Sequence, residues 1–141
     1  MVSRPLVAGV VAFVVMIVVN GAMSALIIEP LLEHRYGDIV AASVQPVALV
    51  VGYAIIAASL VVVHRLAVAG ADLHRAVALG ACMGLAMFAG THAVQAGYTT
   101  IDPIGWIASG IADAVGPTVA MVALSVLEGR ATRHANVAVR R

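Results

Sequence analysis

Charged residues are scarce in this chain, and lysine is absent. Only 11% of the 141 residues are charged, and all eight basic residues among them are arginines. Soluble domains carry about 25% charged residues, so this composition excludes an ordinary soluble domain. The formal net charge of +1 is also too small for a nucleic-acid-binding protein, and we expect no nucleic-acid partner.

Cysteines and catalytic motifs are equally scarce. Cys82 is the single cysteine, which excludes an intramolecular disulfide and a CxxC redox pair. The sequence contains no GxSxG, Walker, HExxH or dinucleotide-binding motif. His64 and His74 flank one short loop, but no cysteine accompanies them to complete the ligand set of a structural metal site. We therefore expect no metal and no cofactor.

What the chain has instead is apolar sequence, with 62% hydrophobic residues and a mean hydropathy of +1.05. Four stretches can each cross a hydrocarbon core about 30 Å thick at about 1.5 Å per helical residue. They run over 5–28, 39–63, 76–98 and 103–127. The sequence therefore predicts an all-α integral membrane protein, a four-transmembrane-helix up-down-up-down bundle that forms one domain over 1–128.

The arginines orient this bundle. If the spans alternate, seven arginines fall on one side of the membrane: Arg4, Arg65, Arg75, Arg130, Arg133, Arg140 and Arg141. Only Arg35 falls on the other side, and arginines beside short loops are retained in the cytoplasm. We expect cytoplasmic N and C termini in a bacterial inner membrane, with the polar basic segment 129–141 as a frayed tail near anionic headgroups. The short inner loop 64–75 predicts that spans two and three are antiparallel neighbours.

Polar residues inside the spans are the candidates for chemistry, because lipid offers them no hydrogen-bond partners. Counted from the outer ends at helical rise, His92 lies about 9 Å deep, Asn20 about 12 Å and Asp113 about 15 Å. Residues three or four apart share a helix face. The candidate ligand-binding set is therefore Asp113, His92, Asn20, Gln95, Ser109 and Ser24.

Pro117 sharpens the case for Asp113. Proline has no N–H, so the Asp113 carbonyl four residues earlier loses its helical donor. One residue then offers a carboxyl and a free backbone acceptor at membrane depth, and with Gly116 beside the proline we expect a kink.

The remaining signals favour helix packing. Gly80 and Gly84 form a GxxxG pattern, which allows close approach of another helix within the bundle or in a dimer, and Gly90 and Pro117 join this packing set. Intramembrane Asn, Gln and His also serve as interhelical hydrogen-bonding groups, so a structural role is an alternative for Asn20, Gln95 and His92.

Several short pieces of the chain resemble a bacterial family of small, four-span predicted membrane proteins of uncharacterised function. They are Asn20, Tyr36-Gly37, Gly84-Leu85, Gly90-Thr91-His92 with Gln95 and Thr99, and Asp113 with Gly116. The family is usually acidic where this chain has Asn20, and it carries Asp and Asn where this chain has His92 and Gln95. The resemblance implies a four-span fold and a role for Asp113, and it implies no particular activity.

Three hypotheses follow. The leading one is a non-enzymatic membrane protein that binds or conducts a small solute, proton or amphiphile in a cavity open to the outside. The second is a structural or assembly subunit, with a second copy or another membrane protein as its partner. The third is an enzyme acting on a lipid or isoprenoid, with Asp113 as acid or base and His92 beside it.

Overall fold

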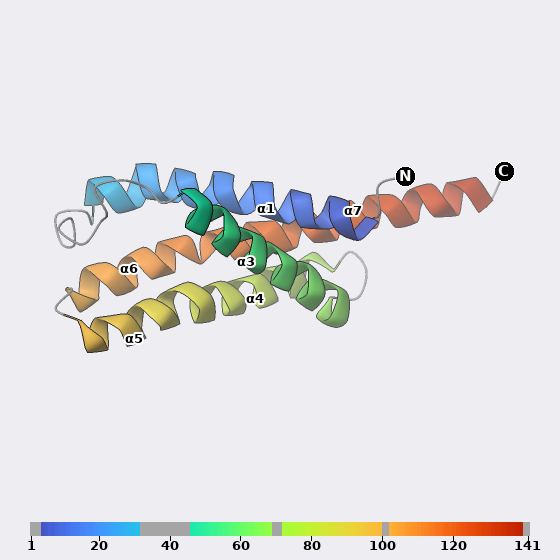
Figure 1. The fold of residues 1–141 in the computed structure, drawn as a ribbon. Helices are drawn as coiled ribbons and strands as arrows, with labels where there is room; N and C mark the ends of the chain where they lie inside the picture. The colour runs from blue at the N-terminus through green and yellow to red at the C-terminus, as the bar shows by residue number, and fades with distance from the viewer. Residues whose placement is uncertain (1–3, 32–45, 69–71, 100–101, 140–141) are drawn as a thin grey trace.

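The computed structural model describes residues 4–31, 46–68, 72–99 and 102–139, and within these ranges the chain is helical with no strand (Figure 1). The first span is α1 (Arg4–Met23) followed by a π-helical turn, η1 (Ser24–Ile28), and the second is α3 (Pro46–Ala67). The third comprises α4 (Leu73–Gly84), the π-helical turn η3 (Leu85–Gly90) and α5 (Thr91–Tyr98). The fourth comprises α6 (Pro103–Asp113) and α7 (Val115–Val139).

The predicted all-α four-helix architecture is confirmed. Four helical segments are long and apolar enough to cross a membrane: Arg4–Leu31, Pro46–Ala67, Leu73–Gly97 and Pro103–Arg130. Both chain termini lie at the same end of the bundle, as an up-down-up-down order requires (Figure 1). Residues 39–45 of the predicted second span lie outside the described residues.

Two aspartates, Asp72 and Asp102, are the N-cap residues of α4 and α6. The Asp72 carboxylate accepts the Arg75 backbone N–H at 3.0 Å at the start of α4. The Asp102 carboxylate accepts the backbone N–H groups of Ile104 and Gly105 at 3.2 and 3.3 Å, and a proline at the first helical position follows it. Each cap satisfies N–H groups that the first turn of a helix leaves without partners.

The fourth span is the centre of the bundle, because α7 packs against α1 on one side and α4 on another. A Cβ added at Gly80 would lie 2.7 Å from Thr118 Cα, and one at Gly84 would lie 2.5 Å from the Ala114 carbonyl oxygen. The two glycines that the sequence marked for packing therefore let α4 approach the fourth span within the same chain. Gly90 is exposed, and an added Cβ there would make only an ordinary contact.

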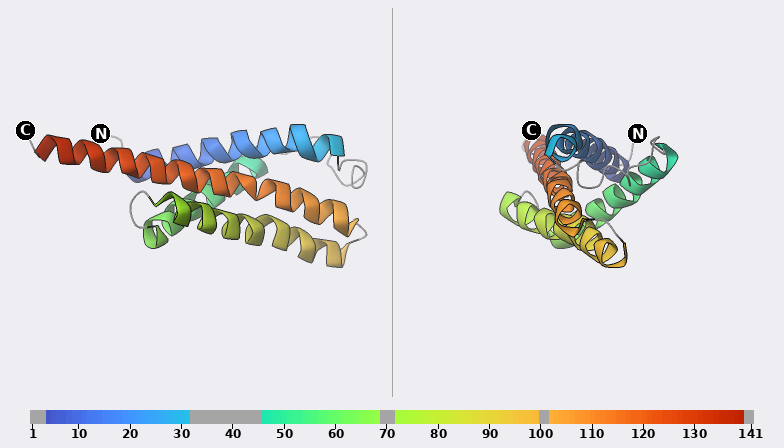
Figure 2. Two further views of the ribbon diagram at one scale, coloured as in Figure 1. Left: turned by 180° about the vertical axis from the view of Figure 1, so that it is seen from behind. Right: turned by 90° about the vertical axis from the view of Figure 1, so that its left-hand side faces the viewer.

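The second span does not pair with the third as we expected from the short inner loop. Among the described residues, α3 packs chiefly on α1 and α7, and it runs obliquely across the other helices (Figure 2). The physical reason is that the small-residue face of α4 packs against α7, which buries Ala76, Gly80 and Gly84. The buried face of α3, with Ala57, Leu60 and Val61, instead meets α1 and α7.

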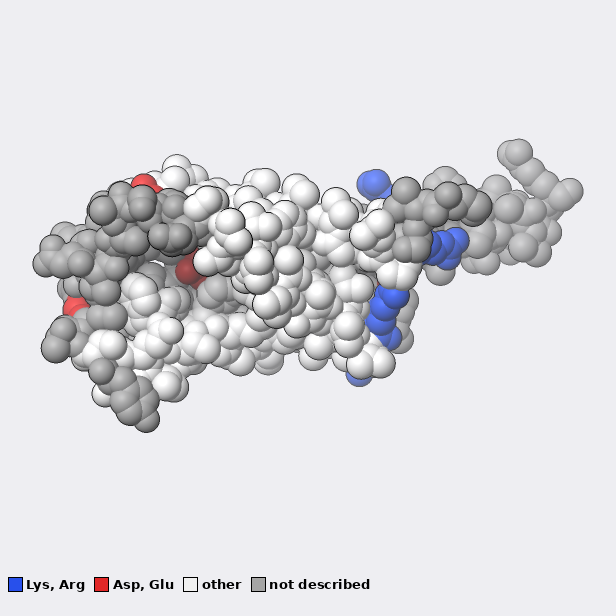
Figure 3. All heavy atoms as spheres, in the orientation of Figure 1, with Lys and Arg blue, Asp and Glu red and all other residues white. Residues whose placement is uncertain are grey.

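The chain beyond the predicted end of the fourth span stays helical. α7 continues through the basic segment as far as Val139. This segment contains no proline that would interrupt the helix. On the face shown in Figure 3, arginine side chains gather toward the end of the molecule that carries the termini, and acidic side chains lie toward the other end. This distribution agrees with the arginine asymmetry in the sequence.

Candidate functional site

Asn20 is the most unusual polar residue of the bundle. It lies near the end of α1 and is 2% exposed, and no described residue makes a hydrogen bond of standard geometry to its Nδ2 or Oδ1. Its carboxamide lies against the backbone of Gly116, where an added Cβ would collide with Asn20 Oδ1. A buried amide without partners costs free energy, and native proteins rarely keep one without a reason.

Two further polar groups complete this location. The half-buried Tyr53 of α3 is near enough to interact with the Asn20 side chain and, electrostatically, with Asp113. Asp113 is itself half-buried, at the last residue of α6. These three residues come from three helices, and we call Asn20, Tyr53 and Asp113 the Asp113 site.

The helix is interrupted at the Asp113 site, one turn before Pro117. Ala114 lies in a turn between α6 and α7, and its N–H is shared between the carbonyls of Gly110 at 3.1 Å and Ile111 at 3.2 Å. The Thr118 hydroxyl donates to the Ala114 carbonyl at 3.0 Å. Because Pro117 has no N–H, the Asp113 carbonyl lacks its usual helical donor. The interruption falls where the sequence predicted a kink.

His92, Gln95, Trp106 and Ser109 lie together in a separate place, the Trp106 cluster. The rings of His92 and Trp106 meet edge to face with centroids 4.4 Å apart and planes at 87°. The Trp106 indole N–H donates to Gln95 Oε1 at 3.2 Å, and the buried Ser109 hydroxyl donates to the Trp106 carbonyl at 2.7 Å. These contacts tie α5 to α6 and anchor the hairpin between spans three and four.

His92 and Asp113 do not meet in the described structure. No hydrogen bond or ion pair joins their side chains, and His92 Nδ1 faces the backbone of Gly110 without a hydrogen-bond partner. Ser24 lies apart from both groups, where its hydroxyl donates to the Glu29 carboxylate at 3.3 Å. The contacts of the described side chains therefore link His92, Gln95 and Ser109 through Trp106, and they do not link these residues to Asp113 or Ser24.

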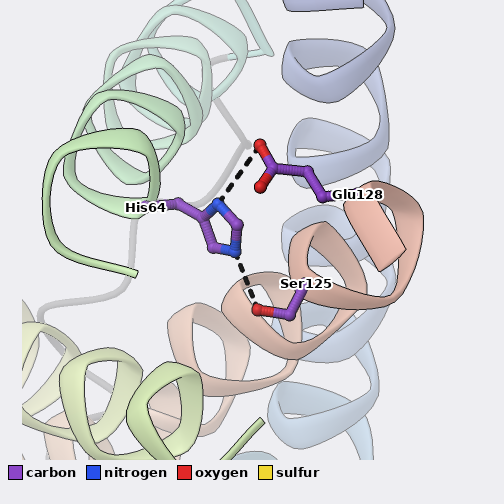
Figure 4. Close-up of polar contacts among 3 residues, drawn as sticks. All are labelled: His64, Ser125 and Glu128. Carbon is purple, nitrogen blue, oxygen red and sulfur yellow. Dashed lines mark hydrogen bonds and ion pairs between the residues drawn. The ribbon is translucent and has the colours of Figure 1, made fainter. Parts of the chain in front are cut away.

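A third polar cluster lies toward the other end of the bundle, between α3 and α7 (Figure 4). His64 Nε2 lies 2.8 Å from Ser125 Oγ in a hydrogen bond, and His64 Nδ1 lies 3.7 Å from a Glu128 carboxylate oxygen. The order serine, imidazole, carboxylate is that of a nucleophilic triad. Ser125 is 0% exposed and His64 is 1% exposed, so a substrate has no access to the hydroxyl in this conformation. The cluster joins two helices.

An apolar layer separates the His64 cluster from the Asp113 site. Met16, Leu60 and Met121 are each 0% exposed and belong to one hydrophobic core. Met121 lies four residues from Pro117 and four from Ser125, so it occupies the helical turn between the two polar groups. The described interior between the Asp113 site and the His64 cluster is therefore apolar.

Among the described residues, no group of three or more His, Cys, Asp or Glu side chains is arranged to hold a metal ion. Histidine, cysteine and carboxylate side chains are the ligands that zinc and other transition metals prefer.

Sequence reasoning missed Tyr53, Ser125 and the role of His64. The three-residue spacing of Ser125 and Glu128 was a usable signal, because it places both on one face of the fourth span. His64, at the inner end of the second span, lies at the same depth. Nothing in the local sequence around Tyr53 distinguishes a phenol that faces the bundle from one that faces lipid.

No protein-family model, no curated protein and no solved structure matches this chain.

Proposed function

We propose that this chain is a multi-pass protein of the bacterial inner membrane, with both termini in the cytoplasm, that binds or passes a small solute or proton at the Asp113 site. The observation that carries the proposal is Asn20, which is 2% exposed and whose two polar atoms have no hydrogen bond of standard geometry within the described part of the chain. A buried carboxamide without hydrogen bonds lowers the free energy of unfolding. A ligand that forms hydrogen bonds to it would give a functional reason for this loss of stability.

Three features support a binding site rather than interhelical hydrogen bonding. A structural amide would donate to or accept from a neighbouring helix, and among the described residues Asn20 makes no such hydrogen bond of standard geometry. Tyr53 and Asp113, on two other helices, are half-buried polar residues that interact electrostatically with each other, and Tyr53 also interacts with Asn20. η1 begins four residues after Asn20, and such π-helical turns are frequent at functional sites.

The route to the Asp113 site is from the outer half of the bundle. Toward the cytoplasmic end, the apolar layer of Met16, Leu60 and Met121 blocks a continuous polar path. A protein that binds its ligand from outside, or that passes it by changing conformation, agrees better with this packing than a permanently open channel does.

The test is the substitution Asn20→Leu, which keeps side-chain size and removes the polar atoms. If Asn20 serves a ligand, the variant is more stable to unfolding than wild type, by about 1 to 3 kcal/mol, because an unsatisfied buried amide is gone. It also loses the small-molecule adduct seen by native mass spectrometry of protein extracted gently from its membrane. Ser59→Ala is the matched control, since the Ser59 hydroxyl is exposed and bonds within its own helix to Ile55. A less stable Asn20→Leu protein that keeps its adduct would contradict the proposal.

A further inference from the structure

A groove lies between α1 and the oblique α3, and we call it the α1–α3 groove (Figure 2). It holds about 410 Å³ of space, and only apolar residues line it. Ala57 and Val61 of its lining belong to the hydrophobic core and are 2% and 8% exposed. Leu6 and Val10, which also line it, are more than half exposed. The groove therefore has a buried apolar floor and opens at the surface that faces lipid in a membrane.

The length of the α1–α3 groove matches one leaflet of a bilayer. Its lining runs from Pro5 to Phe13 on α1 and from Val50 to Val61 on α3. At about 1.5 Å per helical residue, these stretches are about 12 and 17 Å long. One leaflet supplies half of a hydrocarbon core that is about 30 Å thick. The groove is therefore about as long as the acyl chains of a single leaflet.

Two arginines lie at one end of the groove. Arg4 directly precedes Pro5, which lines it at the start of α1. Arg65 follows the groove residues Ala58 and Val61 by seven and four positions, so it lies on the same face of α3. Both arginines are exposed, and neither forms an ion pair with a carboxylate of the described residues. An apolar groove that ends at two such guanidinium groups matches the two parts of a phospholipid, its hydrocarbon chain and its phosphate.

We infer that the α1–α3 groove binds an acyl chain of an anionic phospholipid, whose phosphate lies at Arg4 and Arg65. The lipid belongs to the leaflet on the arginine-rich side, where the described arginines gather (Figure 3). Basic residues at a membrane surface favour anionic over uncharged headgroups. The inference takes from the proposed function only that the chain spans a membrane, and it does not depend on a ligand at the Asp113 site.

A helix of a second copy is the alternative occupant of the groove. Copies that insert in one orientation place their arginines at the same side of the membrane. A second copy in the groove would therefore bring further positive charge toward Arg4 and Arg65, where like charges repel. An anionic headgroup instead neutralises these two residues, so charge complementarity favours the lipid.

Native mass spectrometry of the purified chain in detergent tests the headgroup part of the inference. The protein is titrated with dioleoylphosphatidylglycerol and, in parallel, with dioleoylphosphatidylcholine, which has the same chains and no net charge. We expect one phosphatidylglycerol to stay bound per chain at concentrations where phosphatidylcholine does not. Arg65→Gln should weaken the apparent affinity about fivefold, the effect of one basic residue at a membrane surface. Arg75→Gln is the control, because it removes an exposed arginine of α4, which does not line the groove.

Gly9→Leu tests the apolar part. Gly9 lines the groove, and a Cβ added there would meet no atom within 4 Å, so a leucine side chain extends into open space. We expect this variant to lose the bound phosphatidylglycerol. Gly21→Leu is the matched control on the same helix, since a Cβ there is equally free of neighbours but lies outside the groove, and it should keep the lipid.

Equal retention of the two lipids would overturn the inference, as would phosphatidylglycerol binding that Arg65→Gln and Gly9→Leu leave unchanged. A dimer that Gly9→Leu converts to monomers would also overturn it, because a second copy would then occupy the groove. If Gly9→Leu does not fold, Arg65→Gln decides, since its exposed side chain lies at the helix end. Asn20→Leu should keep the lipid, and Gly9→Leu should keep the small-molecule adduct, so failure of this inference and failure of the proposed function are distinguishable.

Discussion

His64 Nε2 and Ser125 Oγ lie 2.8 Å apart, in a hydrogen bond that joins α3 to α7 across 61 positions of sequence. Both side chains are buried, and Glu128 lies on the other side of the imidazole. Since α3 runs obliquely and does not pack along α4, this bond is one of the few polar ties that hold the second span to the bundle.

Removing one partner of this bond lowers stability. Ser125→Ala leaves a buried imidazole nitrogen without its partner, so we expect a loss of about 0.5 to 2 kcal/mol in the free energy of unfolding, the range for interhelical bonds in membranes and for unsatisfied buried groups. The measurement is denaturant unfolding in mixed micelles. Ser59→Ala on α3 is the control and should change little. Equal stabilities of the two variants would show that the His64 contact contributes nothing.

Gly80 and Gly84 set the distance between α4 and the fourth span. Gly80→Ala and Gly84→Ala each place a methyl group less than 3.0 Å from backbone atoms of the opposing helix, so each destabilises the bundle by about 1 to 3 kcal/mol. Gly52→Ala has no atom within 4 Å of the new Cβ, and it should be neutral or stabilising by about 0.5 to 1 kcal/mol. Unfolding curves of the three variants test this, and a Gly52→Ala protein as unstable as the other two would contradict it.

Gly116→Ala tests the Asp113 site without removing any of its polar groups. The added methyl group meets the Asn20 side chain and forces the carboxamide out of its position. We expect at least a tenfold loss of ligand affinity, on the scale at which about 1.4 kcal/mol is a factor of ten. Gly21→Ala, beside Asn20 in sequence but with nothing within 4 Å, should bind as wild type does. Unchanged binding in Gly116→Ala would place the ligand elsewhere.

The arginine distribution predicts the orientation of the chain in the membrane. A green fluorescent protein fused to the C-terminus should fluoresce, and alkaline phosphatase at the same place should be inactive, because the fluorescent protein folds in the cytoplasm and the phosphatase outside it. Phosphatase fused after residue 31 should be active, since one span then precedes it. The opposite pattern of the two fusions would reverse the topology.

The sequence predicted the helices well because hydrophobic length and helix-start signals are local properties. Pro103 begins α6 behind the Asp102 cap, and the helix is interrupted near Pro117 as the missing N–H requires. The packing face of α4 at Gly80 and Gly84 is also a local property of the sequence, since a GxxxG pattern indicates a packing surface. It does not indicate which helix will occupy that surface.

The arrangement of side chains in space was harder to predict from the sequence than the helices were. Depth counting placed Asn20, His92 and Asp113 at similar levels, but depth does not give the rotation of a helix about its axis. Rotation brought His92 against Trp106 and Gly110 instead of Asp113. It also brought Tyr53, on an oblique helix, toward Asn20, and that angle depends on packing across three helices.

The packed layer of Met16, Leu60 and Met121 also has an electrical consequence. In an energised membrane, the voltage falls mainly across the part of the protein that water cannot enter, and moving one elementary charge through the full potential involves about 2.3 kcal/mol per 100 mV. A proton or charged solute that reaches Asp113 from outside stops before this layer and crosses little of the voltage. Binding should therefore be nearly insensitive to membrane potential, and the voltage dependence of any transport would arise in the step that opens the methionine layer.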